Sequence, residues 1–331
     1  MNLPRFLSRT AWAMLAASCV SGAAMAQQPD FPARSVRLVV ANGPGSVPDL
    51  LARQVGNLVG NLVGRDWKQA IVVENKGAAG GVSAVDAVVK AQPDGYTLLV
   101  GGDSAITIMP NVQRNLPYNV KNDLVPVTKL GQSDFVLVAN PRKGFKTLQD
   151  FVAYAKTHPG KINYASSGTG GAQHLAMEQF KQRAGFFATH IPYRGGPQGL
   201  QDVLAGQVDV MLIAIAPALT QIQSGKLTAL AVSGLQRHAL LPQVQTLAES
   251  YKGFEAGAWF GLFAPKGTPA AVVQAIAQDT DKALKDPELR KSLQQQGITP
   301  VGEGQQVFAK QIKTEDVRVA QLVRSIGLSV E

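Results

Sequence analysis

The sequence predicts an α/β protein of two lobes, each a mostly parallel sheet flanked by helices, with a ligand cleft between the lobes. Near the N-terminus, the apolar strand patterns 35–41, 70–74 and 96–100 alternate with helix patterns at 51–62 and 82–91. Such alternation is typical of a parallel α/β sheet. It begins again after residue 160, and several helix patterns remain at the C-terminal end. We therefore expect two α/β lobes and a tail that returns to the first, with a small-ligand site between them.

The first 26 residues have the pattern of a secretory signal peptide. Arg5 and Arg9 precede a short apolar stretch, 10–20, and Ala-Met-Ala at 24–26 forms a small-x-small cleavage site. The apolar stretch is too short to anchor the chain in a bilayer. We therefore expect cleavage after Ala26 and a periplasmic mature protein.

Cys19 is the only cysteine, and it lies within this segment. Lipoprotein processing at Cys19 is an alternative, although Ala16 stands where a larger aliphatic residue is usual. Without Cys19, the mature chain has no disulfide, thiol nucleophile or thiolate metal site. Roughly 300 residues remain, enough for about two domains whose cores need no disulfide.

The formal net charge is +9, and its basic residues are scattered along the chain without interleaved aromatic residues. Nucleic acid is therefore a poor candidate partner. The charge fits either a solvated basic surface or mild steering of anionic solutes. The four histidines show no metal-ligand spacing, so no metal site is expected. No later apolar run is long enough to span a bilayer.

A turn rich in glycine and proline follows the first strand. Its candidate binding residues are Gly43, Pro44, Gly45, Ser46, Val47 and Asp49. Ser46 and Asp49 have the spacing of a capping box, which predicts a helix start here. Immediately downstream, Gly-Asn-Leu-Val at 56–59 is repeated at 60–63. Four added residues lengthen a helix by about one turn and roughly keep its face, so we interpret the repeat as a tandem duplication.

A third glycine loop, 75–81, precedes the helix at 82–91, and the strand at 96–100 ends at a polar turn. That turn contains Asp103, Ser104 and Ala105, where ligands of parallel sheets gather. Asp103 has two possible roles. It satisfies a nearby turn or helix N-terminus, or it pairs with an ammonium group on the ligand. Extended segments are expected at 124–130 and 135–139, and a helix at 147–156.

A second loop of the same kind lies between a short strand at 161–165 and a helix that ends near residue 183. Its candidate binding residues are Ser166, Ser167, Gly168, Thr169, Gly170, Gly171 and His174. Glycine lets backbone N–H groups approach a ligand, and a helix start leaves unpaired donors and partial positive charge. This combination suits a carboxylate or phosphate. An ordinary capped turn is the alternative, and His174 is either a capping or packing residue or a ligand contact.

The rest of the chain continues the pattern. Strands are expected at 190–193, 208–215, 227–233 and 257–264, and helices at 200–205, 269–285, 287–296 and 304–326. Arg194 follows the first of these strands beside Tyr193. It either reaches a second ligand carboxylate or is an ordinary surface arginine.

Catalytic motifs are incomplete. The segment around Ser166 and Ser167 half-resembles a nucleophile elbow, but Tyr164 stands where its leading glycine belongs. A hydrolase would also need a base such as His174 or His190 with an acid such as Asp209. The glycine loops lack the Gly-Lys-Ser/Thr end of a P-loop and the third glycine of a dinucleotide fingerprint.

Nine stretches, in order, resemble the Bug family, the periplasmic solute receptors of tripartite tricarboxylate transporters. They lie at 37–53, 73–81, 91–99, 116–118, 163–168, 174–176, 191–196, 225–233 and 259–269. Together they extend over essentially the whole mature chain.

The resemblance implies a periplasmic binding protein of the second structural type, with one lobe from 27–130, a second from 131–230, and 231–331 returning to the first. It implies closure around an organic acid without chemistry or cofactor, in a protein we expect to be monomeric. The loops at 43–49 and 166–171 would grip one carboxylate, and 102–105 and 192–195 would line the cleft. We expect segments near 127–130, 230–233 and 260–263 to flex.

Three departures from the family pattern bear on specificity. Asn42 and the turn after it differ from the family's usual first loop, which alters the side-chain donors. Ile213 and Ala214 replace residues that are often polar, which favours an aromatic or aliphatic monoacid over citrate. Asp103, where a small hydroxyl residue is usual, points to a donor group on the ligand.

Three functions follow as hypotheses. The first is a receptor that captures a small carboxylate for a tripartite tricarboxylate-type membrane transporter. The second is an orphan sensor or partner protein with the same fold, because the family has many members without a nearby transporter. The third is a periplasmic hydrolase of small esters that uses Ser166 or Ser167.

Overall fold

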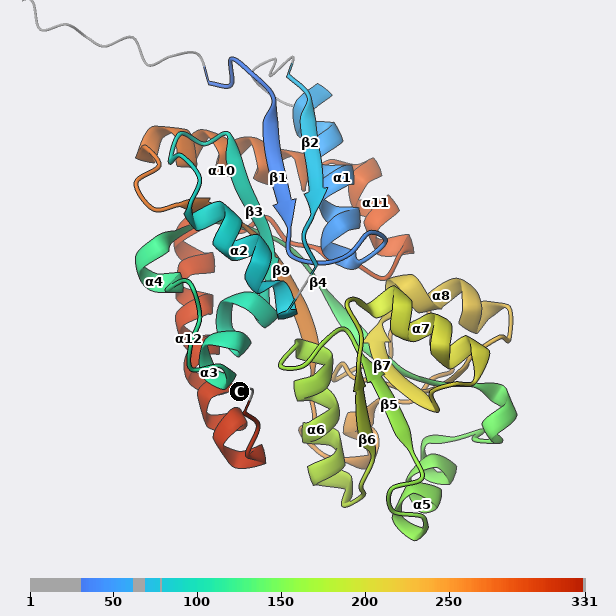
Figure 1. Cartoon of the computed structure of the whole chain (residues 1–331). Helices are drawn as coiled ribbons and strands as arrows, with labels where there is room; N and C mark the ends of the chain where they lie inside the picture. Colours follow the sequence, from blue (N-terminus) through green and yellow to red (C-terminus); the bar gives the residue numbers. More distant parts are fainter. Residues whose placement is uncertain (1–30, 62–68, 78, 330–331) are drawn as a thin grey trace, which may run out of the picture.

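The computed structural model describes residues 31–61, 69–77 and 79–329. The predicted signal peptide, its cleavage site and residues 62–63 of the second Gly-Asn-Leu-Val copy lie outside these ranges. The strands form one mixed sheet in the order β2-β1-β3-β9-β4-β7-β5-β6, and β8 and β10 also pair with β4. Figure 1 shows the strands of two lobes arranged end to end, with helices around each lobe.

The first lobe begins with three parallel strands. β1 (Val36–Val40) lies between β2 (Ile71–Asn75) and β3 (Thr97–Gly102), and both pairings are parallel. α1 (Val47–Asn61) and α2 (Val82–Val89) are the helices that connect these strands. The predicted strand–loop–helix alternation is therefore confirmed in this lobe.

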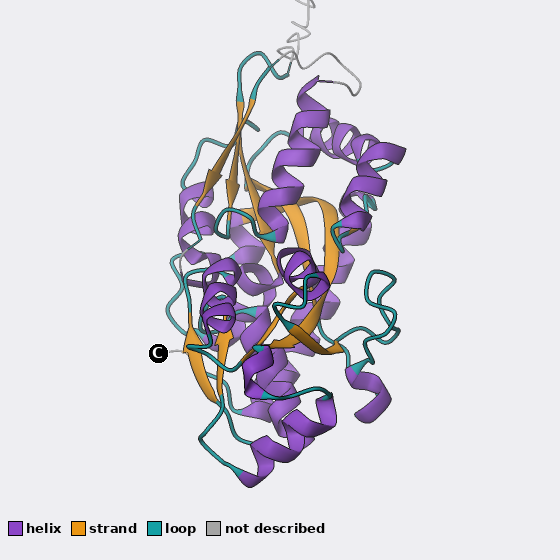
Figure 2. Cartoon of the chain, turned by 90° about the vertical axis from the view of Figure 1, so that its right-hand side faces the viewer, coloured by secondary structure: helices purple, strands orange, loops and turns teal. Residues whose placement is uncertain are grey.

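The C-terminal part of the chain packs on the same lobe. β9 (Gly257–Pro265) pairs antiparallel with β3, and α10 (Ala270–Ala283) packs on both α1 and β4. α11 (Pro287–Gln295) and α12 (Gly304–Ile326) follow, with the bounds that the sequence pattern predicted to within one residue. Figure 2 shows strands through the middle of both lobes and helices covering them.

The second lobe also contains parallel strands flanked by helices. β5 (Asn163–Ser166) pairs in parallel with β6 (Thr189–Pro192) and with β7 (Val210–Ala214). Its helices are α5 (Leu148–Thr157), α6 (Ala172–Ala184), α7 (Gly196–Ala205) and α8 (Ile215–Gln223). Helix α8 was not predicted from the sequence, although its buried Ile215, Ala218 and Leu219 have helical spacing.

One strand joins the two lobes. β4 (Leu124–Ala139) is continuous over 16 residues, where two separate extended segments were predicted. Its first part pairs with β9 as far as Asp134, which faces Gly257, and from Phe135 onward it pairs with β7 and β8 (Thr228–Val232). The polar residues between the two predicted segments remain extended because β9 supplies their hydrogen-bonding partners. Antiparallel pairing in the sheet comes from β4 and β9, which makes the sheet mixed.

The shorter elements complete the chain. They are η1 (Ala79–Gly81), η2 (Ser104–Ile108), α3 (Met109–Val112), α4 (Val120–Asp123), η3 (Pro141–Lys143), α9 (Leu247–Ser250) and β10 (Thr299–Pro300).

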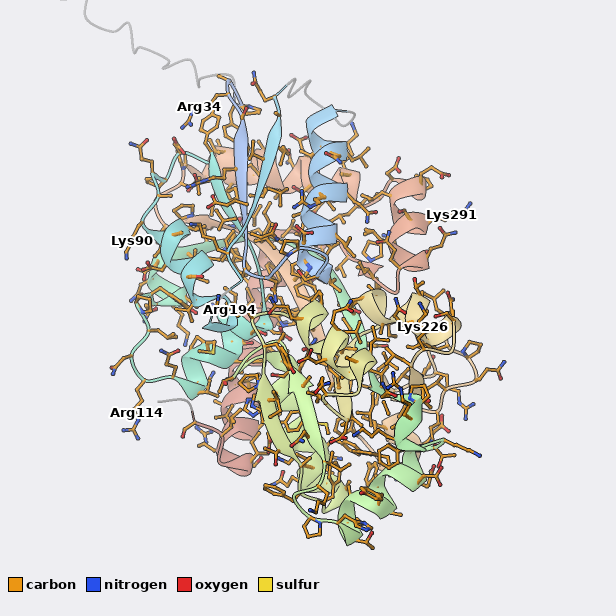
Figure 3. The ribbon with its side chains drawn as sticks, turned by 45° about the vertical axis from the view of Figure 1, so that its right-hand side comes forward. Arg34, Lys90, Arg114, Arg194, Lys226 and Lys291 are labelled. Carbon is orange, nitrogen blue, oxygen red and sulfur yellow. The ribbon has the colours of Figure 1, made fainter. Side chains whose placement is uncertain are left out.

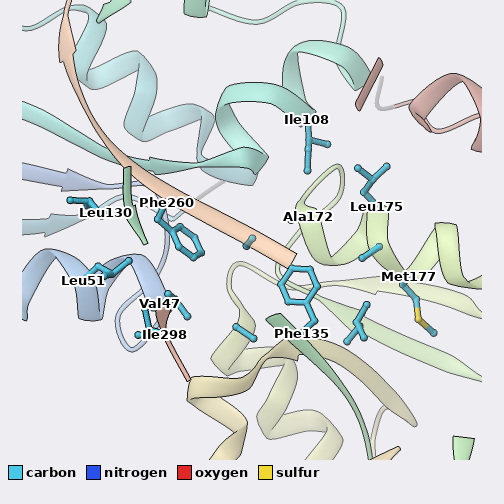
Figure 4. Packing of buried hydrophobic residues seen from close by; sticks show 14 of the residues in the cluster. Val47, Leu51, Ile108, Leu130, Phe135, Ala172, Leu175, Met177, Phe260 and Ile298 are labelled. Carbon is cyan, nitrogen blue, oxygen red and sulfur yellow. The ribbon is translucent and has the colours of Figure 1, made fainter. Parts of the chain in front are cut away.

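The largest buried apolar cluster continues from one lobe into the other. Figure 4 shows part of it, with Val47 and Leu51 of the first lobe on one side and Ala172 and Leu175 of the second on the other. The contact between the lobes therefore includes buried apolar side chains from both of them. Within the described ranges, every helix is too short or too polar to cross a membrane.

Candidate functional site

A cavity of about 50 Å³ lies where the two lobes meet. Its walls are Ala41, Asn42, Ser46, Val47, Pro48, Gly80, Gly102, Asp103, Ser104, Ala105, Phe135, Ser167, Ala172, Gln173, Gly196, Pro197, Ile213, Ala214, Pro217, Ala258 and Phe260. Both lobes contribute, mostly through strand ends and the loops that follow them. The structure thus brings the two predicted glycine loops to one cavity.

Four helix N-termini converge on this cavity. Val47 and Pro48 begin α1, Ala172 begins α6, Pro197 lies in the first turn of α7, and Pro217 lies in the first turn of α8. Each N-terminus carries partial positive charge and unpaired N–H donors. None of the lining residues that the structure describes is Lys, Arg or His. Positive potential in the cavity therefore comes from the backbone.

The first turn of α6 retains donor capacity. The N–H of Ala172 donates to Ser104 Oγ of the first lobe at 3.0 Å. In the part of the chain that the structure describes, the next two N–H groups, of Gln173 and His174, have no acceptor. Two donors at a helix start that borders a cavity are suited to binding a carboxylate.

The loop before α6 separates two adjacent serines. Ser167 lines the cavity, and its N–H donates to the Gln173 side chain at 2.9 Å. Ser166 is fully buried, and its hydroxyl lies 2.6 Å from His190 Nε2 and 3.1 Å from the carbonyl oxygen of Gly168. Ser166 therefore holds the loop in shape, and Ser167 faces the cleft.

His174 supports the same loop from behind. Its Nδ1 accepts the Gly170 N–H at 3.0 Å, and its ring stacks on His190 at a centroid distance of 3.8 Å. Glu178 lies beyond the pair and accepts hydrogen bonds from the Tyr164 hydroxyl and from Lys181. Burial lowers the pKa of His174 to about 4, and burial together with the neighbouring His174 ring lowers the pKa of His190 to about 3. Both rings are therefore neutral at pH 7.

The first loop is organised around Asp49, which is only 3% exposed. Its carboxylate accepts hydrogen bonds from the Gly45 N–H, from Arg53 and from Asn75, at 2.9, 3.0 and 3.0 Å. Burial by itself raises the pKa of Asp49, but these hydrogen bonds outweigh burial and hold it below its ordinary value.

Ser46 and Asp49 do not form the predicted capping box with each other's backbone N–H groups. The Ser46 hydroxyl donates to the Gly43 carbonyl at 2.6 Å, because the loop turns back on itself, and Asp49 therefore reaches Gly45 instead. Gly43, Pro44, Gly45 and Asp49 are not among the lining residues, whereas Ser46 and Val47 are.

The remaining predicted residues divide in the same way. Asp103, Ser104, Ala105, Ile213 and Ala214 line the cavity. Gly168, Thr169, Gly170, Gly171 and His174 shape the second loop without lining it. Around the mouth, a Cβ added to Gly168 would lie 3.8 Å from Gly80 N, and one added to Gly195 would lie 4.0 Å from Gly43 N. These are ordinary van der Waals distances, so the loops of the two lobes lie next to each other here.

Tyr193 and Arg194 lie on the loop before α7. The Tyr193 hydroxyl donates to Asp202, and Arg194 is exposed. Figure 3 shows Arg194 near the level at which the lobes meet, and it shows the other labelled basic residues, such as Lys90 and Lys291, spread over the surface. This spread matches the scattered charge seen in the sequence.

The residues proposed for ester hydrolysis are not assembled as a triad. Asp209 accepts from the Asn163 N–H at 2.7 Å and pairs with Lys143. Its carboxylate is thus committed away from His190, the histidine beside Ser166. In the described ranges, no group of three or more His, Cys, Asp and Glu side chains could hold a metal ion.

Several lining residues were missed from the sequence. Phe135, Ala258 and Phe260 form, with Ile213 and Ala214, an apolar wall. Gln173, Pro197 and Pro217 border the helix starts. Proline near the start of a helix was an available signal for the α7 and α8 N-termini. The aromatic wall had no local signal, because Phe135 and Phe260 lie on different strands of the sheet.

The fold and the cleft between its lobes define the class of periplasmic binding proteins. The model of the tripartite tricarboxylate transporter family receptor matches residues 51–328. A UPF0065 protein of Bordetella pertussis is 35% identical over 307 residues, which is 92% of this chain and 94% of the relative. The chain therefore belongs to the tripartite tricarboxylate transporter receptor family, which includes the Bug proteins.

Solved structures of periplasmic binding proteins have the same fold as this chain. The periplasmic binding protein BugD superposes with a TM-score of 0.86 at 30% identity, over 91% of this chain and 100% of BugD. Rpa4515 of R. palustris with adipate gives a TM-score of 0.86 at 26% identity, over 91% and 99%. MatC of Rhodopseudomonas palustris with bound malate gives 0.82 at 30% identity, over 88% and 100%. Family and fold thus confirm the resemblance found in the sequence.

Proposed function

We propose that this protein is a periplasmic receptor that binds a small organic carboxylate between its lobes and delivers it to a tripartite tricarboxylate-type transporter. The observation that carries the proposal is the convergence of four helix N-termini on a cavity whose described lining contains no basic side chain. Backbone dipoles from both lobes act on one small anion, which links binding to the contact between the lobes.

The neighbours support the ligand class. Two structures of similar fold were solved with the dicarboxylates adipate and malate. In this chain, we assign direct contact with the carboxylate to the loops at Ser46–Val47 and Ser167 and to the α6 N-terminus. Gly43, Asp49, Ser166 and His174 hold these loops in position. Arg194 and Tyr193 stay predictions as contacts at the rim.

We propose that binding closes the lobes about the residues at which the chain crosses between them. The cavity of about 50 Å³ has room for only a few water molecules, at roughly 10–15 Å³ each. Ligand entry therefore requires the lobes to separate. The crossings lie at Asp134–Phe135 and between Ser233 and Gly257. We accordingly place the lobe boundaries a few residues after 130 and in the segment after 232, near the predicted 130/131 and 230/231.

We also propose that the chain reaches the periplasm through the predicted signal peptide, with cleavage after Ala26, and acts there as a monomer without a cofactor. Cleavage is measured by N-terminal sequencing of protein recovered from the periplasm. A mature N-terminus at residue 27 is expected, and an acylated Cys19 would establish the lipoprotein alternative instead.

Isothermal titration calorimetry with a panel of mono-, di- and tricarboxylic acids and matched neutral amides tests the binding function. We expect at least one acid to bind with a Kd in the micromolar range or below and its amide not to bind. A parallel thermal-shift screen is informative because a ligand bound to the folded state raises Tm. Failure of every acid in both assays would overturn the proposal.

Two alternatives are separated by further experiments. A fluorophosphonate probe labels an activated serine, so labelling that is lost in Ser166→Ala or Ser167→Ala would favour the hydrolase. Pull-down from membranes with and without the bound acid distinguishes delivery to a transporter from signalling to another membrane protein.

A further inference from the structure

Asp103 is the only acidic or basic side chain among the described residues that line the cavity. It is 4% exposed and caps η2, with Oδ1 accepting the Ser104 N–H at 2.8 Å. No Lys, Arg or His in the described ranges forms an ion pair with it. Buried carboxylates are ordinarily paired with a cation, because leaving one unpaired is costly.

The nearest charged groups are already engaged elsewhere. Arg318 donates twice to Glu315, at 3.0 and 2.6 Å. Lys129 donates to the side-chain oxygens of Gln132 and Gln311. Glu315 adds a further negative charge to the surroundings of Asp103. Arg318 and Lys129 therefore act on Asp103 only at longer range, and among the described residues neither forms an ion pair with it.

An acid in a cavity built for an anion can carry a negative charge there only where a cation lies beside it, because burial disfavours its charged form. We infer that the ligand carries, besides its carboxylate, a cationic amine, and that Asp103 binds this amine. The inference deepens the proposed carboxylate-binding function and rests on it. Asp103 would thereby determine specificity, because acids without the amine leave its carboxyl group without a cationic partner.

The wall next to Asp103 describes the middle of the ligand. Gly102 faces Phe260 in the β3–β9 register, and a Cβ added to Gly102 would lie 2.9 Å from the Phe260 ring. Phe135 and Ile213 continue the apolar wall. The apolar wall and the buried acid, which suggested different ligands in the sequence, thus belong to one cavity. An amine and a carboxylate separated by an apolar spacer, as in an ω-amino acid, satisfies both.

Proton exchange gives this arrangement a measurable signature. Burial raises the pKa of Asp103 to about 8, a shift that Glu315 increases and that the backbone N–H groups of Ser104 and Trp259, together with Arg318, oppose. Burial thus favours the protonated form of Asp103 in the free protein. Binding of an ammonium group ionises the acid and releases that proton, whereas a second ligand carboxylate would retain it.

The test is calorimetry of paired acids on the intact mature protein, in two buffers of different ionisation enthalpy. The pairs are butyrate with 4-aminobutyrate and pentanoate with 5-aminopentanoate, and glutarate is the dicarboxylate arm. We expect each amino acid to bind roughly tenfold or more tighter than its partner, since hydrogen bonds to charged groups are the strong ones. We also expect net release of protons at pH 7 when each amino acid binds, and none when its partner acid binds.

Asp103→Asn keeps an acceptor for the Ser104 N–H and removes the charge. It should reduce the preference for the amine to within about threefold and abolish proton release. Glu288→Gln on α11, which removes an exposed acid remote from the cavity, is the matched control and should change neither. If the Asp103→Asn variant does not fold, the affinities of the wild-type protein for the paired acids and its proton release test the amine assignment without it.

The outcomes distinguish the two levels of the proposal. If glutarate binds more tightly than 5-aminopentanoate without proton release, the amine assignment is wrong, while the carboxylate receptor stands. If butyrate and its amino counterpart bind equally, the assignment is also wrong. If none of these acids nor any of the wider panel binds, both proposals fail.

Discussion

The hydroxyl oxygen of Ser104 accepts a hydrogen bond from the backbone N–H of Ala172, at 3.0 Å. Ser104 follows β3 of the first lobe, and Ala172 begins α6 of the second. This bond therefore exists only when the lobes are together. It connects the closed arrangement to the helix start that we propose binds the carboxylate.

Ser104→Ala should weaken ligand binding by about two- to tenfold, the range of a typical hydrogen bond, because it removes a contact made only in the closed arrangement. Calorimetry measures the affinity, and small-angle scattering measures closure. Ser83→Ala is the control, since that exposed hydroxyl donates only to the Lys76 carbonyl. Equal affinity in Ser104→Ala and wild type would show that the bond does not contribute to closure.

Ser167→Trp should abolish binding and leave the fold intact, because Ser167 lines the cavity. We expect no detectable heat of binding and a Tm within about 2 °C of wild type. Ser166→Trp provides the contrast, since its site is fully buried and hydrogen-bonded to His190. Overpacking there should lower Tm strongly or prevent folding. If Ser167→Trp lowered Tm strongly and Ser166→Trp did not, the assignment of their roles would be wrong.

Ser233→Ala should destabilise the junction between the lobes. The Phe135 N–H donates to Ser233 Oγ at 2.8 Å, and the Ser233 hydroxyl donates to the Ala256 carbonyl at 2.6 Å. Removing the hydroxyl leaves buried groups unpaired, so urea denaturation should show a loss of about 1–3 kcal/mol or more. Ser224→Ala, an exposed hydroxyl bonded to Gln221, should stay within about 0.5 kcal/mol of wild type. A Ser233→Ala protein as stable as that control would disprove the prediction.

The buried histidine pair should make stability depend on pH. The pKa of His174 is lowered by burial to about 4 in the folded protein, against an ordinary value of 6.5. The unfolded chain therefore binds the proton first, and folding stability falls as pH drops from about 6.5 toward 4. The loss is on the order of 3 kcal/mol for His174 by pH 4. His190, stacked on it, adds to the same trend.

Urea denaturation of wild type and of His174→Gln at several values of pH measures this effect. The glutamine side chain keeps an acceptor for the Gly170 N–H but does not titrate. We expect its stability to fall less steeply between pH 6.5 and 4 than that of wild type. Parallel curves for the two proteins would show that His174 does not titrate in this range.

Much of the fold could be predicted because it is local. The apolar runs at β1, β2 and β3, the helix spacing in α1 and α12, and the glycine loops between them depend on near neighbours in the chain. The two glycine loops followed by helix starts correctly indicated where backbone donors would lie. Asp103, Ile213 and Ala214, which depart from the family pattern in the sequence, all line the cavity.

The sequence by itself determined the strand–loop–helix units, the positions of the helix starts and the family pattern, because these depend on propensity and spacing over a few residues. Only the tertiary structure decided that Ser167 faces the cleft while Ser166 is buried on His190, and that Phe135 and Phe260 form one wall. It also decided that, among the described residues, no Lys, Arg or His forms an ion pair with Asp103. These features depend on which segments pack together in space, and those segments lie far apart in the chain.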